Sequence, residues 1–77
     1  MKFKKLEIVV LAHDISEHRL KSGDVGTVVE VYPGGGVEVE FVTGSGETQA
    51  LLTLSERDVR RIDAHELLAT RRLAKVN

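Results

Sequence analysis

The sequence predicts a small all-β protein, a partly open barrel of five strands, and three observations support this. Five short apolar segments, rich in Val, Ile and Leu, are separated by polar or glycine-rich turns within residues 1–62. A single capped helical turn, beginning at Ser55, stands directly before the last of these segments. The chain has 77 residues, which is enough for one domain with a thin core.

The first predicted strand covers residues 6–12 and is almost continuously apolar, which suits a strand buried on both faces. A polar loop follows, and we expect its two apolar residues, Ile15 and Leu20, to fold onto the barrel. The other predicted strands cover residues 27–32, 37–41, 48–54 and 59–62.

Alternation of apolar and polar residues predicts which side chains face the core. In segment 37–41 the outward residues are Glu38 and Glu40. Its inward residues are Val37, Val39 and Phe41. Regular alternation in segment 27–32 would place Val28, Glu30 and Tyr32 on one face, with Val29 and Val31 on the other.

The end of the chain has a composition typical of helices, so we predict a barrel over residues 1–62 and a helical extension over residues 63–77. Its apolar residues do not form a single stripe, because Arg71 falls among them on a helical wheel. Such a tail can dock loosely, order on a partner or fray. It also offers a route to a homodimer.

The order of strands and of the single helical turn fits an SH3-like barrel better than an OB-fold. Residues 21–28 resemble the KOW pattern, a basic residue and a glycine, then a second glycine and an alternating strand. Gly23 and Gly26 match the two glycines of that pattern, and Asp24 suits the turn between them. KOW segments belong to ribosomal and transcription-elongation proteins, so the resemblance implies contacts with RNA or protein.

A longer resemblance runs from Phe3 to about Arg61. Its matching segments are 9–11, 14–15, 20–21, 23–24, 26–32, 38–42 and 50–54. Over these residues the chain resembles a small bacterial family, domain of unknown function 4926. Some members are thought to be encoded beside toxin-like proteins, which would imply an antitoxin or immunity role. The resemblance assigns no catalytic residue, and the tail after Ile62 lies beyond it.

Charge is distributed unevenly along the chain. Residues 1–21 carry a net charge of +2, residues 22–56 of −6 and residues 57–77 of +3. The central strands should therefore present an acidic face that attracts a basic partner protein. The candidate partner-binding residues are Glu30, Tyr32, Glu38 and Glu40. The same face would also suit a plain solubilising surface that blocks edge pairing.

The basic end of the chain is a candidate phosphate-contacting region. Its arginines are Arg57, Arg60, Arg61, Arg71 and Arg72. They support an alternative function, a KOW-type module that binds RNA or the ribosome. The acidic central strands argue against that alternative, because they repel nucleic acid.

No catalytic constellation is found in the sequence, so we expect a non-enzymatic binding module without a cofactor. The loop from His13 to His18 contains two histidines and two carboxylates, but its spacing matches no established metal motif. Cysteine is absent, and no apolar run approaches the length of a membrane span. We expect a cytoplasmic protein with no bound metal and no contact with a membrane.

Overall fold

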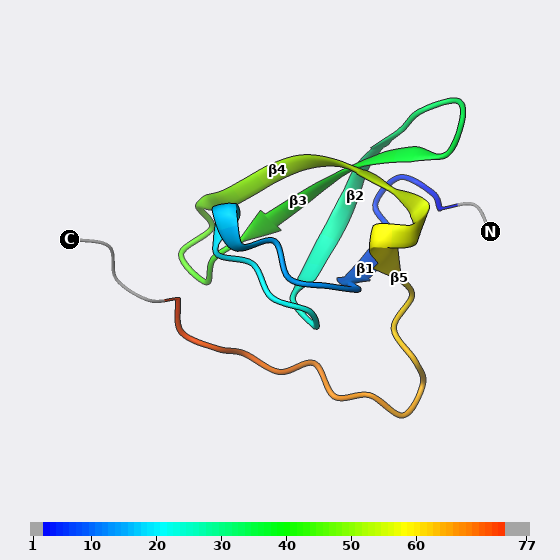
Figure 1. Cartoon of the computed structure of the whole chain (residues 1–77). Helices are drawn as coiled ribbons and strands as arrows, with labels where there is room; N and C mark the ends of the chain where they lie inside the picture. The colour runs from blue at the N-terminus through cyan, green and yellow to red at the C-terminus, as the bar shows by residue number, and fades with distance from the viewer. Residues whose placement is uncertain (1–2, 74–77) are drawn as a thin grey trace.

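The structure, a computed structural model, describes residues 3–73. Five antiparallel strands form one open sheet in the order β4-β3-β2-β1-β5 (Figure 1). The strands are β1 Ile8–Leu11, β2 Val25–Val31, β3 Gly36–Val42, β4 Thr48–Ser55 and β5 Val59–Arg60. Two 3-10 turns accompany them, η1 Ser16–His18 and η2 Glu56–Asp58. The predicted all-β, barrel-like architecture, with a helical turn before the last strand, is confirmed.

The core lies on the concave side of this sheet, where the twisted strands curl around one cluster of side chains. Segment 37–41 alternates as predicted, since Val37, Val39 and Phe41 are each at most 3% exposed. Leu20 is buried and Ile15 packs against the cluster, so the loop does fold onto the barrel. The buried cluster comprises Phe3, Val9, Leu11, Leu20, Val28, Val37, Val39, Phe41, Ala50 and Val59.

In segment 27–32 the predicted face of Val28 is wrong, because β2 contains a bulge, whereas Glu30 and Tyr32 do share the outer side. Val28 pairs with buried Val39, whereas Glu30 pairs with outward Glu38. The register shift between them leaves Val29 as the extra residue. A bulge exchanges the two faces of a strand, so Val28 enters the core while Glu30 stays on the outer face.

The predicted helical tail is also wrong over residues 63–73, which form a turn at residues 64–65 and then irregular chain. Leu67 and Leu68 are 92% and 69% exposed, so they supply no buried stripe for a helix. Instead the chain turns back from β5 toward the turn between β3 and β4 (Figure 1). The last part of the predicted extension, residues 74–77, lies outside the described residues.

The returning tail lies beside the outer face of the barrel. Val10 points away from the core cluster yet is only 5% exposed. It lines a shallow hollow together with Ile62, Leu67 and Ala69. The prediction that the first strand is buried on both faces therefore holds for its centre, and residues of the tail line the hollow on its outer side.

Candidate functional site

The candidate site is the acidic outer face of β2 and β3, which we call the acidic face and define by Glu30, Glu38 and Glu40. Glu30 and Glu38 are directly paired across the two strands, and Glu40 stands opposite Thr27. Directly opposed side chains in an antiparallel pair lie about 5 Å apart at Cβ, and like charges in that position are destabilising. The structure thus brings together the three glutamates that the sequence singled out.

Hydroxyl groups on neighbouring strands hold two of these carboxylates in place. Thr53 donates its hydroxyl to Glu38 Oε1 at 2.6 Å, and Tyr32 donates to the same oxygen at 3.2 Å. Thr48 donates to Glu40 Oε2 at 2.7 Å. Sequence reasoning missed both threonines, although the alternation of residues 51–53 would have placed Thr53 on the outer face.

One positive charge compensates the acidic face within residues 3–73, since Lys5 Nζ lies 3.4 Å from Glu30 Oε1. The Val31 N–H, which donates to Glu30, and the neighbouring Lys5 lower the pKa of that carboxyl. Desolvation and the hydrogen bond to Glu38 raise the pKa of Tyr32. At neutral pH the face therefore presents an ionised Glu30 and the neutral phenol of Tyr32, whose hydroxyl donates a hydrogen bond to Glu38.

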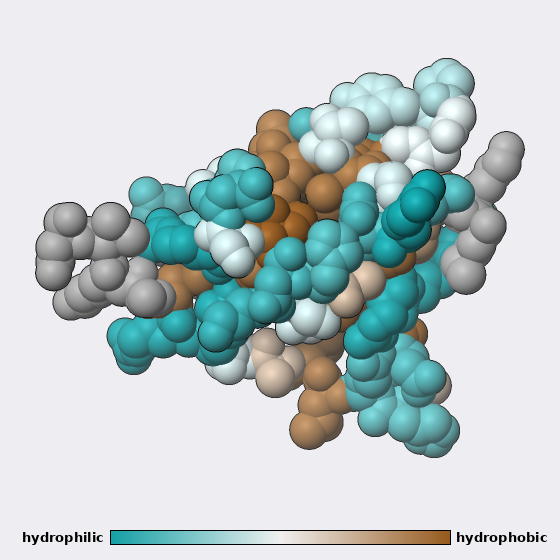
Figure 2. Space-filling model, viewed as in Figure 1, coloured by the Kyte–Doolittle hydropathy of each residue, from teal (hydrophilic) through white to brown (hydrophobic). Residues whose placement is uncertain are grey.

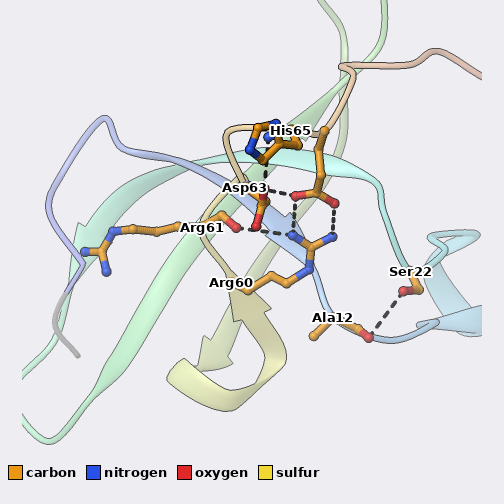
Figure 3. A network of polar contacts seen from close by, with 7 residues as sticks. Ala12, Ser22, Arg60, Arg61, Asp63 and His65 are labelled. Atoms are coloured by element: carbon orange, nitrogen blue, oxygen red, sulfur yellow. Dashed lines mark hydrogen bonds and ion pairs between the residues drawn. The ribbon is translucent and has the colours of Figure 1, made fainter.

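Three of the five candidate arginines are engaged within their own chain. Arg60 makes a bidentate pair with Glu66, with both N–O distances at 2.7 Å. This pair closes the turn after β5, where Asp63 accepts a hydrogen bond from the backbone of His65 (Figure 3). The guanidinium of Arg60 lowers the pKa of Glu66 to about 2.

The other two engaged arginines connect distant segments. Arg61 pairs with Glu7 and lies over the ring of Phe3, 4.8 Å from its centroid. Arg71 donates two hydrogen bonds to the carboxylate of Asp24, at 2.8 and 2.6 Å, and the guanidinium lowers the pKa of that carboxyl. Both pairs fasten the region after β5 to the barrel.

Arg57 and Arg72 differ from these three, because neither side chain has an ion pair within residues 3–73. Both residues are exposed. The structure therefore does not gather the five arginines into one basic patch facing solvent.

The two glycines of the KOW-like turn have different structural roles. Gly23 adopts a φ of 95°, which is unfavourable for residues with a side chain. Gly26 has an ordinary φ, but a Cβ there would stand 2.6 Å from Val39 Cγ1. Asp24 accepts a hydrogen bond from Lys21 N at 2.8 Å, and so closes the turn.

The loop from His13 to His18 does not assemble a metal site in the described part of the chain, where no group of three or more candidate ligands was found. Instead His13 Nε2 lies 2.7 Å from Asp58 Oδ1. That hydrogen bond raises the pKa of His13 and lowers the pKa of Asp58. No local sequence pattern predicts that His13 pairs with Asp58, because the two residues are 45 positions apart.

Comparison with known proteins adds one finding. No curated protein and no solved structure matched the chain. Within residues 3–73, no helix is long and apolar enough to span a bilayer. The family described as Domain of unknown function (DUF4926) matches residues 5–61, a region that contains all five strands and ends before the tail. The chain therefore belongs to this family of unknown function.

Proposed function

We propose that this protein is a non-enzymatic binding module whose acidic face recognises a basic surface on a partner protein. The observation that carries the proposal is the direct pairing of Glu30 with Glu38, with Glu40 on the same face. A like-charged cross-strand pair lowers the stability of the free protein. Lysine or arginine side chains of a partner would relieve that repulsion and accelerate association.

The family resemblance narrows the choice of partner. It implies an antitoxin-like or immunity-like role, which makes the product of a neighbouring gene the first candidate to test. Such a partner would present basic residues to the acidic face. The proposal includes a cytoplasmic location, where an antitoxin-like protein would meet its partner.

RNA binding remains the competing prediction. It requires arginines that can reach phosphates, whereas Arg60, Arg61 and Arg71 already hold carboxylates of their own chain. Breaking those pairs would add to the cost of binding RNA, and the acidic face would repel the backbone phosphates. The geometry therefore favours a protein partner.

The test compares two triple variants with the same change in net charge. The first, Glu30→Gln, Glu38→Gln and Glu40→Gln, neutralises the acidic face. The second neutralises three glutamates elsewhere, at Glu17, Glu47 and Glu56. Each variant and the unaltered protein are co-expressed with the product of the neighbouring gene, and complexes are separated by size-exclusion chromatography at two salt concentrations.

We expect the complex to form with the unaltered protein and with the second variant, and to be lost or strongly weakened with the first. Salt should weaken the complex, because exposed charges are screened. Equal binding by both variants would overturn the role of the acidic face. Binding of a single-stranded RNA oligonucleotide at low salt, lost on Arg57→Ala and Arg72→Ala but without a protein complex, would favour the alternative.

A further inference from the structure

Strand β4 forms one open edge of the sheet, and between a bulge at Gln49 and the start of η2 it lacks the usual protection against pairing. It has eight residues, whereas β5 at the other edge has two. Its sequence, TQALLTLS, contains no lysine, no other charged residue and no proline. Natural edge strands are commonly short or carry such residues, because a long neutral edge is a template for another strand.

The hydrogen-bond pattern shows which backbone groups of β4 face the open edge. Tyr32 N donates to Gly36 O at 2.8 Å, so this pair of β2 and β3 is hydrogen-bonded. Alternation along the antiparallel ladder then directs the backbone groups of Glu38 toward β2 and those of Val39 toward β4. Val39 pairs with Leu52, whose backbone groups are therefore used within the sheet.

The neighbours of Leu52 consequently turn their backbone groups outward. Leu51 and Thr53 each direct an N–H and a C=O toward the open edge, where no other strand of the described chain, residues 3–73, pairs with them. The same alternation turns the Ser55 N–H outward, and that group donates to Asp58 Oδ2 at 2.8 Å. Because this N–H is bonded to Asp58 and not to β3, it does point away from β3 as the alternation predicts, which supports the same outward direction for the groups of Leu51 and Thr53.

Each side of this edge has a distinct chemistry. On the outer side, the hydrogen bonds to Thr53 and Thr48 draw the carboxylates of Glu38 and Glu40 toward β4. On the core side, Leu52 and Leu54 are only partly buried. Figure 2 shows hydrophobic atoms gathered on the surface along the course of β4. On the outer side Leu51, which pairs with Glu40, is 53% exposed.

We propose that the β4 edge binds an extended segment of the partner protein as an additional antiparallel strand. This inference rests on the proposed function and specifies its binding mode. The segment pairs with Leu51 and Thr53 through its backbone. The residues of the segment that lie opposite Leu51 and Thr53 are basic, and their side chains are on the outer side, near Glu38 and Glu40. The residue between them is apolar and faces Leu52.

Charge complementarity favours a basic partner segment over a second copy of this chain. A second β4 strand would bring no positive charge to the acidic face, because it contains no lysine or arginine. It would also bring its own acidic face nearer to the first. Self-pairing is therefore an outcome that contradicts the proposal.

The probe is the peptide acetyl-KVKVKVK-amide, titrated into the ¹⁵N-labelled full-length protein. A matched peptide with Glu in place of Lys tests charge. Two further peptides carry backbone N-methyl groups, either on the lysines, whose N–H groups would face β4, or on the valines, whose N–H groups would face away. We expect binding by the unmodified and valine-methylated peptides, with the largest shifts at the amides of Leu51 and Thr53.

Two protein variants test the edge from the other side. Leu51→Pro removes an outward N–H without breaking a bond to β3, a position at which an edge strand tolerates proline. Leu51→Thr changes the same side chain but keeps the N–H. We expect Leu51→Pro to fold, as judged by circular dichroism, and to bind the peptide about tenfold more weakly, a loss typical of one or two hydrogen bonds. Leu51→Thr should bind within about threefold of the unaltered protein, as expected of a minor surface change.

The outcomes separate this proposal from the proposed function. If both methylated peptides bind equally and Leu51→Pro has no effect, while the acidic-face variant binds weakly, strand addition is wrong and the acidic face stands. Strand addition is also overturned if the peptide does not bind at millimolar concentration. The same holds if the NMR signals of the Leu51 and Thr53 amides shift with protein concentration but not with added peptide, because that result indicates pairing between two copies of β4. If the acidic-face variant retains the neighbouring-gene partner and the peptide, the proposed function fails.

Discussion

The substitution Gly26→Ala tests why the KOW-like turn needs a second glycine. An alanine Cβ at this position would stand 2.6 Å from Val39 Cγ1, 2.9 Å from Phe41 Cε1 and 3.1 Å from Glu40 O. Carbon atoms in favourable contact are about 3.5–4.0 Å apart, so both side chains must retreat by about 1 Å. Val39 and Phe41 are 0% and 3% exposed, which leaves them little room to do so.

Overpacking of this kind costs about 1–3 kcal/mol. The lower entropy of the unfolded alanine chain returns about 0.4–1 kcal/mol, so the steric term dominates. Because two buried side chains must move, we take the upper end of the steric cost, and the net loss in the free energy of unfolding is then about 2 kcal/mol. The corresponding decrease in Tm is about 8–16 °C for a chain of this size.

The assay is urea denaturation followed by circular dichroism, with two other glycines as references. Gly23 has a φ of 95°, and a Cβ added there would meet nothing within 4 Å, so Gly23→Ala should cost about 1 kcal/mol through backbone strain alone. Gly44 has neither constraint, and Gly44→Ala should change stability by less than about 0.5 kcal/mol.

A second measurement tests the contact itself. Val39→Ala removes the atom closest to the new Cβ, so it should be less destabilising in the Gly26→Ala protein than in the unaltered one. A steric clash at Gly26 is refuted if the free energies of unfolding of Gly26→Ala and the unaltered protein differ by less than about 0.5 kcal/mol. It is also refuted if the effects of Gly26→Ala and Val39→Ala on that free energy are simply additive.

Three further predictions concern the contacts that fasten the loops and the tail. His13→Ala should destabilise the protein most between pH 4 and pH 6, because the raised pKa of His13 makes its charged pair with Asp58 fully effective below about 6.5, the ordinary histidine value. The effect should fade as pH rises through the raised pKa, and also in acid as Asp58 protonates; a pH series of urea denaturations measures it, and a flat profile would exclude the pair. Arg71→Ala should release the tail from Asp24 and so accelerate chymotrypsin cleavage within residues 63–73, with Arg72→Ala as the control. Removal of residues 63–77 should leave a folded barrel that is about 1 kcal/mol less stable, because Val10 loses the apolar residues Leu67 and Ala69 beside it and Asp24 loses its contact with Arg71; denaturation of the shortened chain checks this.

Local patterns in the sequence were sufficient to predict the strands. The alternation of Val37, Val39 and Phe41 with glutamates has one physical solution, a strand with one buried face. The same reasoning failed at Val29, because a bulge leaves no clear trace in a run of β-branched residues. Strict alternation then assigned Val28 to the wrong face.

The acidic face was predictable as a group of charges, but its hydroxyl partners and its relation to the open edge were not. Pairing of Glu30 with Glu38 follows from the turn between two adjacent strands, which are neighbours in sequence. The pairs of His13 with Asp58 and of Arg71 with Asp24 join residues 45 and 47 positions apart. Such pairs depend on how the barrel closes, and composition carries no information about that. The tail was mistaken for a helix because its propensity is helical, whereas its contacts require an irregular path.

The pairing of β1 with β5 has a consequence for the order in which the chain can fold during synthesis. Strands β2, β3 and β4 are joined by consecutive hairpins, so each strand can pair with the one before it as soon as it leaves the ribosome. Strand β1 gains its second neighbour only when Val59 and Arg60 emerge, because these residues pair with Leu11 and Val10. Until that moment the nascent chain has two open edges, at β1 and at β4. The last strand, although only two residues long, leaves β4 as the one long open edge in the described sheet.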